Sequence, residues 1–271
     1  MLKYVMLFLL PVLLSGCALR PPRSPAWHRD SQPPLFTFVQ LNDTHIQDPN
    51  RKPLPYEKCN EKVEYLVKSF NEGKHFKLPD FVLLVGDIIN GGATFARPAS
   101  IHENVNDLQE AKRILSGLKC PYYTVIGNHE YIGGSTNAAV YSAYEEVFGP
   151  DKINYTFLHK GVLFVCMDNF RDWGKNDGMT AERNVWLADI FKKYPDTPKI
   201  LAGHFPVYCV RDEDVFLKSL GLNINWMWGD STRNFLKENK ETVIAFLAGH
   251  NHLTGVIDVE GIKHIVVSGT A

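Results

Sequence analysis

One arrangement recurs along the sequence: an apolar run leads directly into a short block of polar residues. The runs are rich in β-branched and aromatic residues, so each predicts a buried strand that ends at a loop. They extend from Phe36 to Leu41, from Phe81 to Val85, from Tyr122 to Ile126 and from Ile244 to Ala248. Helix-like segments are expected at about Glu57 to Glu72, Asn104 to Leu118 and Thr180 to Tyr194. This alternation predicts parallel strands whose C-terminal ends share one edge, where open α/β sheets bind their ligands.

The polar blocks at this edge carry carboxylates, imidazoles and one amide oxygen, without cysteine. Such a mixed nitrogen and oxygen set suits Mn²⁺, Zn²⁺ or iron better than an all-oxygen Mg²⁺ or Ca²⁺ site. Seven ligands exceed the needs of one tetrahedral ion and fit two ions if one carboxylate is shared. The seven candidate ligands are Asp43, His45, Asp87, Asn128, His204, His250 and His252.

The order of the blocks resembles that of the calcineurin-like metallophosphoesterase superfamily. The blocks are Asp43-Thr44-His45, Gly86-Asp87, Gly127-Asn128-His129-Glu130, Gly203-His204 and Gly249-His250-Asn251-His252. The resemblance extends from about Leu35 to the C-terminus. It implies a four-layer αββα sandwich of two mixed sheets flanked by helices, with a dinuclear metal site at the C-terminal strand edge. It also implies that Asp43, His45 and His252 bind one metal, that Asn128, His204 and His250 bind the other, and that Asp87 bridges them.

The chemistry expected of such a site is hydrolysis of a phosphoester. Two divalent ions, Mn²⁺ first and Fe or Zn as alternatives, would lower the pKa of a bridging water, and the bridging hydroxide would attack phosphorus. The resemblance implies that His129 faces the substrate and protonates or stabilises the leaving oxygen. Asn90 is either a turn former or a partner that orients His129, and we expect the second role. Glu130 is another orienting residue or an ordinary first-turn acid, and the sequence does not separate these roles.

Substrate selectivity must come from loops, because a metal pair recognises phosphate generically. The segment from Phe205 to Asp230 carries candidate substrate contacts. Its tryptophans could instead pack in the core or in a lid, which is the more common role of this residue type than stacking on a base. Aromatic and guanidinium groups could stack on a base or hold a second phosphate. These candidates are Tyr208, Arg211, Trp226 and Trp228.

One subgroup is more similar than the rest of the superfamily. The stretches Gly86 to Gly91, Gly127 to Tyr131 and Gly261 to His264 resemble the manganese-dependent ADP-ribose/CDP-alcohol diphosphatases, although His45 stands where that subgroup tends to carry glutamine. We therefore expect a phosphodiesterase or nucleotide diphosphatase acting on a small phosphorylated substrate, a class that includes nucleotide-derived substrates. The alternatives are a phosphomonoesterase of the acid-phosphatase type and a non-catalytic binding lipoprotein with the same fold.

Composition is consistent with one catalytic domain over residues 35–271. The chain of 271 residues is 45% hydrophobic and 22% charged, which is sufficient for a large core. A net charge of −1 with no long basic run does not indicate nucleic-acid binding. The chain stops at Ala271 soon after a predicted strand, where relatives usually continue, so a truncated C-terminus is one expectation. The oligomeric state is not indicated.

The first seventeen residues predict an export signal. Lys3 precedes a short apolar stretch, and this stretch ends at Leu14-Ser15-Gly16-Cys17. The apolar stretch is too short to span a bilayer comfortably. This ending resembles a bacterial lipobox and implies a lipid anchor at Cys17, with the protein on the outer membrane facing the periplasm. A secreted or soluble periplasmic protein is the alternative. Residues 18–34 are proline-rich and predict a tether.

Two further features concern structure rather than chemistry. The cysteines Cys59, Cys120, Cys166 and Cys209 lack a disulfide-type spacing, and we expect mostly buried free thiols. Two hairpins are predicted, with turns at Lys160-Gly161 and Glu260-Gly261. Their strands are expected from Tyr155 to Leu158, Val162 to Met167, Leu253 to Val259 and Ile262 to Val267.

Overall fold

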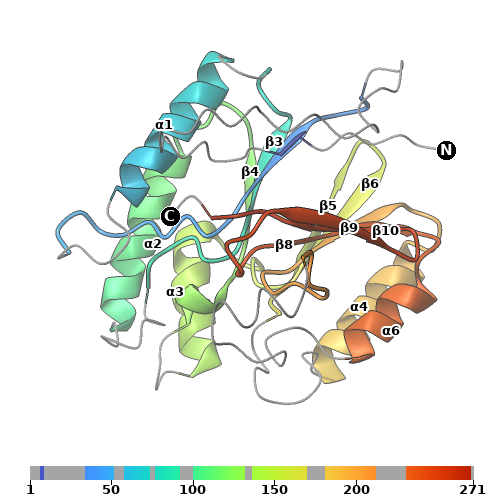
Figure 1. The fold of residues 1–271 in the computed structure, drawn as a ribbon. Coiled ribbons are helices and arrows are strands. Elements are labelled where there is room, and N and C mark those ends of the chain that lie inside the picture. The colour runs from blue at the N-terminus through green and yellow to red at the C-terminus, as the bar shows by residue number, and fades with distance from the viewer. Residues whose placement is uncertain are drawn as a thin grey trace.

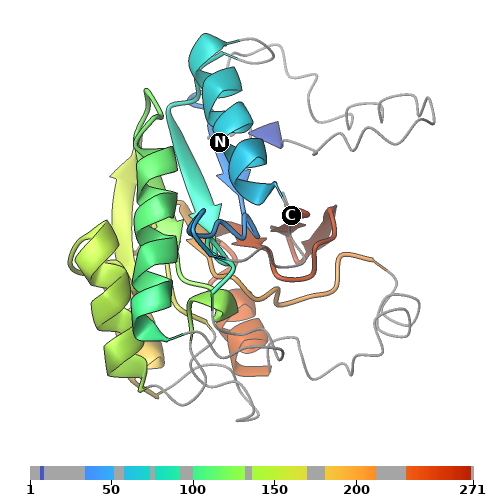
Figure 2. The same cartoon turned by 90° about the vertical axis from the view of Figure 1, so that its left-hand side faces the viewer.

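The protein folds into four layers, with two sheets between two groups of helices (Figures 1 and 2). The computed structural model describes residues 7–8, 34–51, 58–73, 77–91, 100–131, 136–169, 181–211 and 230–269. In Figure 1 the helices α1, α2 and α3 lie on the left and the helices α4 and α6 lie at the lower right, with the strands between them. The expected αββα sandwich is confirmed.

The first sheet is entirely parallel and has the strand order β1-β2-β3-β4. Its strands are β1 (Leu7–Phe8), β2 (Phe38–Leu41), β3 (Phe81–Val85) and β4 (Tyr122–Val125). The helices that cover its outer face are α1 (Cys59–Glu72), α2 (Ile101–Leu115) and α3 (Asn137–Phe148). A short 3-10 helix, η2 (Asn128–Glu130), follows β4.

The second sheet is mixed and has the order β5-β6-β7-β8-β10-β9, in which only the outermost strands run antiparallel to their neighbours. Its strands are β5 (Tyr155–His159), β6 (Val162–Cys166), β7 (Lys199–Ala202), β8 (Val243–Ala248), β9 (Gly255–Val259) and β10 (Ile262–Val266). The helices α4 (Ala181–Lys193) and α6 (Asp230–Glu238) cover its outer face.

The alternation of side chains along each strand divides the core into three apolar layers. In β3, Phe81, Leu83 and Val85 face the second sheet, whereas Val82 and Leu84 face helices α1 to α3. The layer between the sheets is aromatic, and Phe38 and Phe81 stack there with ring centroids 5.1 Å apart. Both faces of each central strand are thus buried, which explains why these strands read as continuous apolar runs.

The predicted strands and hairpins are confirmed, with ends that move by one or two residues. Helix α2 begins three residues earlier than expected because Ser100 and Glu103 form a capping box that satisfies its first backbone N–H groups. The turns at Lys160-Gly161 and Glu260-Gly261 take positive φ at both residues, as a tight hairpin turn requires. Helix α3 and strand β7 were not anticipated from the sequence.

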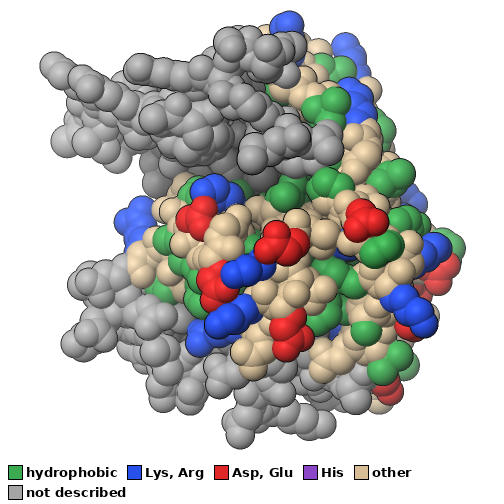
Figure 3. Space-filling view, turned by 90° about the vertical axis from the view of Figure 1, so that its right-hand side faces the viewer, with side chains coloured by type: hydrophobic (Ala, Val, Ile, Leu, Met, Phe, Trp, Pro, Cys, Tyr) green, Lys and Arg blue, Asp and Glu red, His purple; other side chains and the backbone are tan. Residues whose placement is uncertain are grey.

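The chain before Leu35 is described only at Leu7–Phe8, which pairs with β2, and at Pro34. The export signal, the anchor and the tether therefore stay predictions. No helix among the described residues is both long and apolar enough to cross a membrane. The four domain cysteines are buried free thiols, as expected. On the face shown in Figure 3, acidic and basic side chains are interspersed among the coloured atoms.

Candidate metal centre

The loops that carry the candidate ligands lie side by side because the strands before them are neighbours. Asp43 donates its backbone N–H to Gly86 (3.0 Å), and His45 donates to Asp87 (3.1 Å), so the loops after β2 and β3 continue the pairing of those strands. In the second sheet, Gly249 donates to the carbonyl of His204 (2.9 Å). Residues more than two hundred positions apart are thereby brought to one edge.

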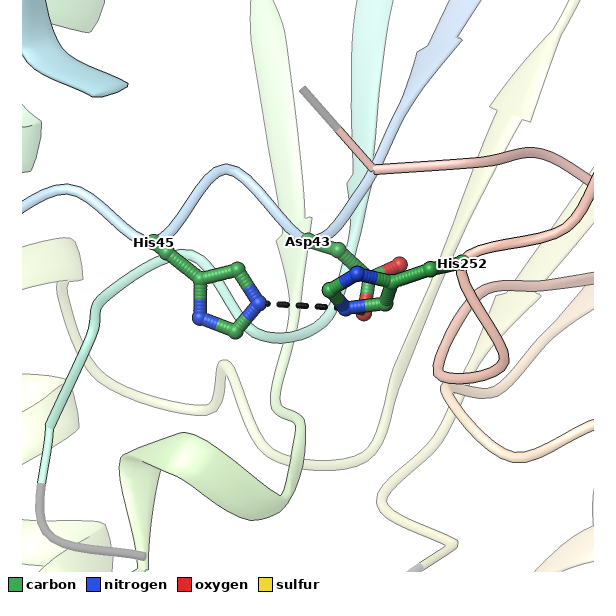
Figure 4. Close-up of side chains that lie close together, drawn as sticks. All are labelled: Asp43, His45 and His252. Atoms are coloured by element: carbon green, nitrogen blue, oxygen red, sulfur yellow. Dashed lines mark hydrogen bonds and ion pairs between the residues drawn. The ribbon is translucent and has the colours of Figure 1, made fainter. Parts of the chain in front are cut away.

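One group of candidate ligands consists of Asp43, His45 and His252, whose ligand atoms lie within 4.8 Å of one another (Figure 4). The Nε2 atoms of His45 and His252 are 3.3 Å apart, and Asp43 Oδ1 is 3.2 Å from His252 Nε2. Asp43 is buried, whereas the His252 side chain is 35% exposed. This group is open to solvent on the His252 side.

A second group is formed around Asp87 by residues of both sheets. Asp87 Oδ2 is 3.1 Å from His204 Nε2, and the ligand atoms of Asp87, His204 and His250 also lie within 4.8 Å of one another. Asn128 Oδ1 is 3.1 Å from His204 Nε2 and 2.9 Å from His250 Nδ1. All seven candidate ligands are thus brought together, with Asp87 placed between the two groups.

The orientation of His204 shows that this donor set fits a cation. Its Nδ1 lies 2.9 Å from the carbonyl oxygen of Val85, which can only accept a hydrogen bond, so Nδ1 carries the proton. In the neutral ring, Nε2 then turns a lone pair toward the Asp87 carboxylate and the Asn128 amide oxygen. Three electron-pair donors that face one another in a buried space repel unless a positive charge lies between them.

The protonation states of the site also favour binding of a cation. Burial opposes ionisation of both carboxyls, yet His252 and His204 hold the pKa of Asp43 below its ordinary value, and His204 and His129 hold that of Asp87 well below it. Burial lowers the pKa of His45 to about 4. At neutral pH the site therefore holds two carboxylates and a neutral His45 imidazole, which are the forms that bind metals.

The pKa of the two remaining buried histidines moves in opposite directions. Burial, reinforced by the charge of His204, lowers the pKa of His250 to about 3. For His204 burial acts in the same downward direction, but the Asp87 carboxylate outweighs it and raises the pKa. A proton or a metal ion can therefore occupy His204 Nε2, and metal binding at this position releases the proton.

Five of the seven candidate ligands have a left-handed backbone. Their φ angles lie between 45° and 67°, a region that non-glycine residues rarely adopt. Such strain clusters at functional sites, where the surrounding structure holds it in place. These five residues are Asp43, His45, Asp87, His250 and His252.

The glycine before Asp87 is required by the close approach of the two sheets. Gly86 has φ 80°, and a Cβ atom there would lie under 3.0 Å from the ring of His204. Any side chain at this position would push His204 away from Asp87. Gly127, Gly203 and Gly249, which precede other candidate ligands, face atoms at similarly short range.

The expected contact between Asn90 and His129 is made by the backbone of Asn90. His129 Nδ1 lies 3.3 Å from the backbone carbonyl of Asn90, while the Asn90 side-chain amide instead donates to Gln47 (3.2 Å). The contact to His129 therefore comes from the main chain of Asn90. His129 Nε2 is 3.8 Å from Asp87 Oδ2, so its imidazole borders the site.

Glu130 is a buried structural acceptor. Its carboxyl accepts the backbone N–H groups of Ile88 (2.7 Å), Ile89 (3.1 Å) and Gly127 (2.5 Å). Burial raises the pKa of Glu130 to about 7. These bonds hold the loop after Asp87 against the turn that carries Asn128. Glu130 is thus both a first-turn acid, which caps η2 at Gly127, and a residue that holds the loop after Asp87 through its backbone.

Another orienting residue was missed in the sequence. Asn42 donates its side-chain amide to Asp43 Oδ2 (2.5 Å) and to the carbonyl of Val267 (2.6 Å), and so ties the Asp43 loop to the end of β10. The available signal was a polar residue directly between the strand and Asp43.

The candidate substrate contacts lie partly outside the described residues, which do not include Trp226 and Trp228. The ring of Tyr208 packs edge-on against His264 (4.6 Å between centroids) and under the guanidinium of Arg233 (5.0 Å), on the helix side of the second sheet. Arg211 donates to the carbonyl of Thr254 (3.2 Å). These contacts place Tyr208 in packing between the sheet and α6.

Comparison with known proteins agrees with the site. Residues 36–253 match the calcineurin-like phosphoesterase family. A curated relative, the "Probable glycerophosphodiester phosphodiesterase GpdQ" of Arcobacter nitrofigilis, is 24% identical over 216 residues, which are 79% of this chain and 71% of the relative.

Two solved structures share the fold. A dimetal phosphatase from Danio rerio superposes with a TM-score of 0.62 at 18% identity, over 88% of each chain. The protein TT1561 of Thermus thermophilus superposes with a TM-score of 0.53 at 13% identity, over 86% of this chain and 88% of that one.

The chain therefore belongs to the calcineurin-like phosphoesterase family. Family membership, together with the clustered ligand set, makes it a phosphoester hydrolase with a dinuclear divalent metal site. The non-catalytic alternative is thereby set aside.

Proposed function

We propose that the protein hydrolyses phosphodiesters, with a small diester or nucleotide diphosphate conjugate as substrate and Mn²⁺ as the preferred metal. One observation supports diesters over monoesters: the curated relative aligned along 79% of this chain carries the name of a glycerophosphodiester phosphodiesterase. The mixed carboxylate, imidazole and amide ligand set supports manganese, with iron and zinc as alternatives.

The proposed ligands divide into two sets that share Asp87, and two of the three close groups of side chains support this division. Asp43, His45 and His252 would hold one ion, and Asn128, His204 and His250 the other, with Asp87 shared. When bound, the two ions neutralise the phosphoryl oxygens and supply an activated water for in-line attack. The protein contributes a buried and prearranged set of donors, so little reorganisation is needed at the moment of reaction.

His129 is proposed to handle the proton of the leaving group. Nδ1 is held at 3.3 Å by the carbonyl of Asn90, which leaves Nε2 as the nitrogen that points toward the site. A protonated Nε2 can donate to the leaving oxygen as the bond to phosphorus breaks.

A pair of chromogenic substrates tests this proposal. The full-length chain loaded with Mn²⁺ should hydrolyse bis-p-nitrophenyl phosphate, and its kcat/KM for this diester should exceed that for p-nitrophenyl phosphate by roughly tenfold or more, equivalent to about 1.4 kcal/mol in transition-state binding. Turnover of glycerophosphocholine against ADP-ribose then separates a diester from a diphosphate substrate. Cleavage of the monoester alone would show that the protein is a phosphomonoesterase.

A further inference from the structure

Two adjacent residues outside all of the motif blocks reach into two ligand-bearing loops. Asp168 and Asn169 follow β6 in the second sheet, and their exposed fractions are 0% and 2%. Neither belongs to a candidate ligand group. Their side chains point to loops that come from different sheets, one after β4 and one after β7.

Asn169 forms two hydrogen bonds with the loop that carries His204. Its Nδ2 donates to the carbonyl of Phe205 (2.9 Å), and its Oδ1 accepts the N–H of the same residue (2.9 Å). The amide also lies directly over Gly203, where a Cβ atom would be under 3.0 Å from Asn169. His204 is thus enclosed between two residues that contact Asn169.

Asp168 holds the turn that carries Asn128 and His129. Tyr131, the residue after η2, donates its hydroxyl to Asp168 Oδ2 (2.5 Å). Tyr141 of helix α3 donates to the same oxygen at the same distance, and the buried Arg183 of α4 lies 3.9 Å from it. Burial and the Asp168 charge raise the pKa of Tyr131, so its phenol keeps the proton that it donates.

We propose that Asp168 and Asn169 form a clasp that sets the separation between Asn128 and His204. These two ligands of the same proposed metal come from different sheets, and their donor atoms are 3.1 Å apart. No strand pairing joins the two sheets within the described residues, so this spacing depends on contacts made by side chains, and those of His204 with Val85 and Asp87 are joined by those of Asp168 and Asn169. The inference rests on the proposed division of ligands but not on the identity of the substrate. Asp168 and Asn169 are positioning residues, because they act through Tyr131 and Phe205.

Two tyrosines that bind the same carboxylate oxygen, and whose hydroxyl oxygens lie 3.0 Å apart, provide a matched test. Tyr131→Phe removes the hydroxyl on the ligand-bearing turn, whereas Tyr141→Phe removes its counterpart on helix α3. Mn²⁺ affinity would be measured by calorimetric titration of the full-length chain without substrate. We expect Tyr131→Phe to weaken one of the two Mn²⁺ sites, the one proposed to use Asn128 and His204, by about tenfold, as is common when a supporting partner of a ligand is lost. Tyr141→Phe should stay within about twofold of the wild type.

The visible spectrum of the Co²⁺-loaded protein provides a second readout. Tyr131→Phe and Asn169→Ala should alter the d–d bands because the ligand spacing changes, and Tyr141→Phe should leave them as in the wild type. Equal weakening by the two tyrosine variants, or wild-type affinity in Tyr131→Phe, would overturn the clasp. Failure to cleave diesters would overturn the proposed substrate while leaving this result intact, since no step of the measurement uses substrate.

Discussion

The metal centre and the β9–β10 hairpin contain the same kinds of residue in different surroundings. Each region contains a buried histidine, at least one aspartate, and residues with positive φ. In the hairpin, Asp258 forms an exposed ion pair with Lys263, which holds the pKa of Asp258 below its ordinary value. At the metal centre, Asp87 is buried and its neighbours are imidazoles. An exposed ion pair contributes little, whereas a buried carboxylate among imidazoles is a reactive group.

Their histidines differ in the same way. His264 lies in the middle of β10 between the rings of Tyr208 and Phe246, and burial lowers its pKa to about 4. His204 is equally buried, yet the carboxylate of Asp87 raises its pKa. The first is a core residue that stays neutral, and the second is a candidate ligand at which a proton competes with a metal ion. The residue type alone does not distinguish them.

The largest contrast is expected from removing one charge in each region. Asp87→Asn keeps the shape of the side chain and a residue type that tolerates positive φ, so the fold should persist. We expect kcat/KM for the diester to fall by roughly 10³-fold, because the shared carboxylate contributes several kcal/mol of charge stabilisation. Asp258→Asn should stay within about twofold of the wild type. Steady-state kinetics and the metal content of both variants would be measured together. Similar activity in the two variants would remove the distinction between the regions.

A pair of glycines tests the backbone part of the comparison. Gly86 and Gly261 have φ of 80° and 89°, but a Cβ atom at Gly86 would overlap His204, whereas none of the described atoms lies within 4 Å of one at Gly261. Gly261→Ala should cost about 1 kcal/mol of unfolding free energy, the cost of the left-handed conformation alone. Gly86→Ala should cost roughly 3 kcal/mol or more, since overpacking is added. Urea denaturation of both metal-free variants measures this difference. Equal losses of unfolding free energy would show that the backbone at Gly86 shifts to accommodate the added Cβ atom.

The parts of the fold that were predictable are those determined by local pattern. The strand before Asp87 reads as five apolar residues because both of its faces are buried, and the turn at Glu260-Gly261 is marked by its own residues. Six of the seven candidate ligands follow such a predicted strand, whereas the strand before His204, β7, was not anticipated. Helix α3 was missed, although Thr136 caps its first turn by accepting the N–H of Ala139.

The parts that could not be predicted depend on contacts between distant segments. Asn169 bonds to Phe205, 36 residues away, and Tyr131 bonds to Asp168, 37 residues away. Nothing in the sequence near Asp168 marks it as a partner of the Asn128 turn. Similarly, the backbone N–H groups of Asp43 and His45, which have positive φ, donate to the neighbouring loop, a contact that the local sequence does not show.

The smallest expected effect is the share of the pH dependence that the hairpin contributes, in addition to that of His45 and His250, whose pKa values are also lowered. His264 has a folded-state pKa of about 4, below the 6.5 of an unfolded chain. The unfolded chain therefore binds a proton first as the pH falls. The contribution of this residue to stability is complete above pH 6.5 and is lost as the pH approaches 4. Between pH 8 and pH 5 the loss should be about 2 kcal/mol.

His264→Phe isolates this effect because phenylalanine fills the same aromatic contacts without titrating. The unfolding free energy of the metal-free variant should fall less steeply than that of the wild type over the same pH range. His102→Gln, at an exposed position near the start of α2, serves as the control and should keep the wild-type slope. An unchanged slope in His264→Phe would show that the hairpin contributes nothing, and that His45 and His250, whose pKa values are also lowered, carry the acid sensitivity of the metal-free protein.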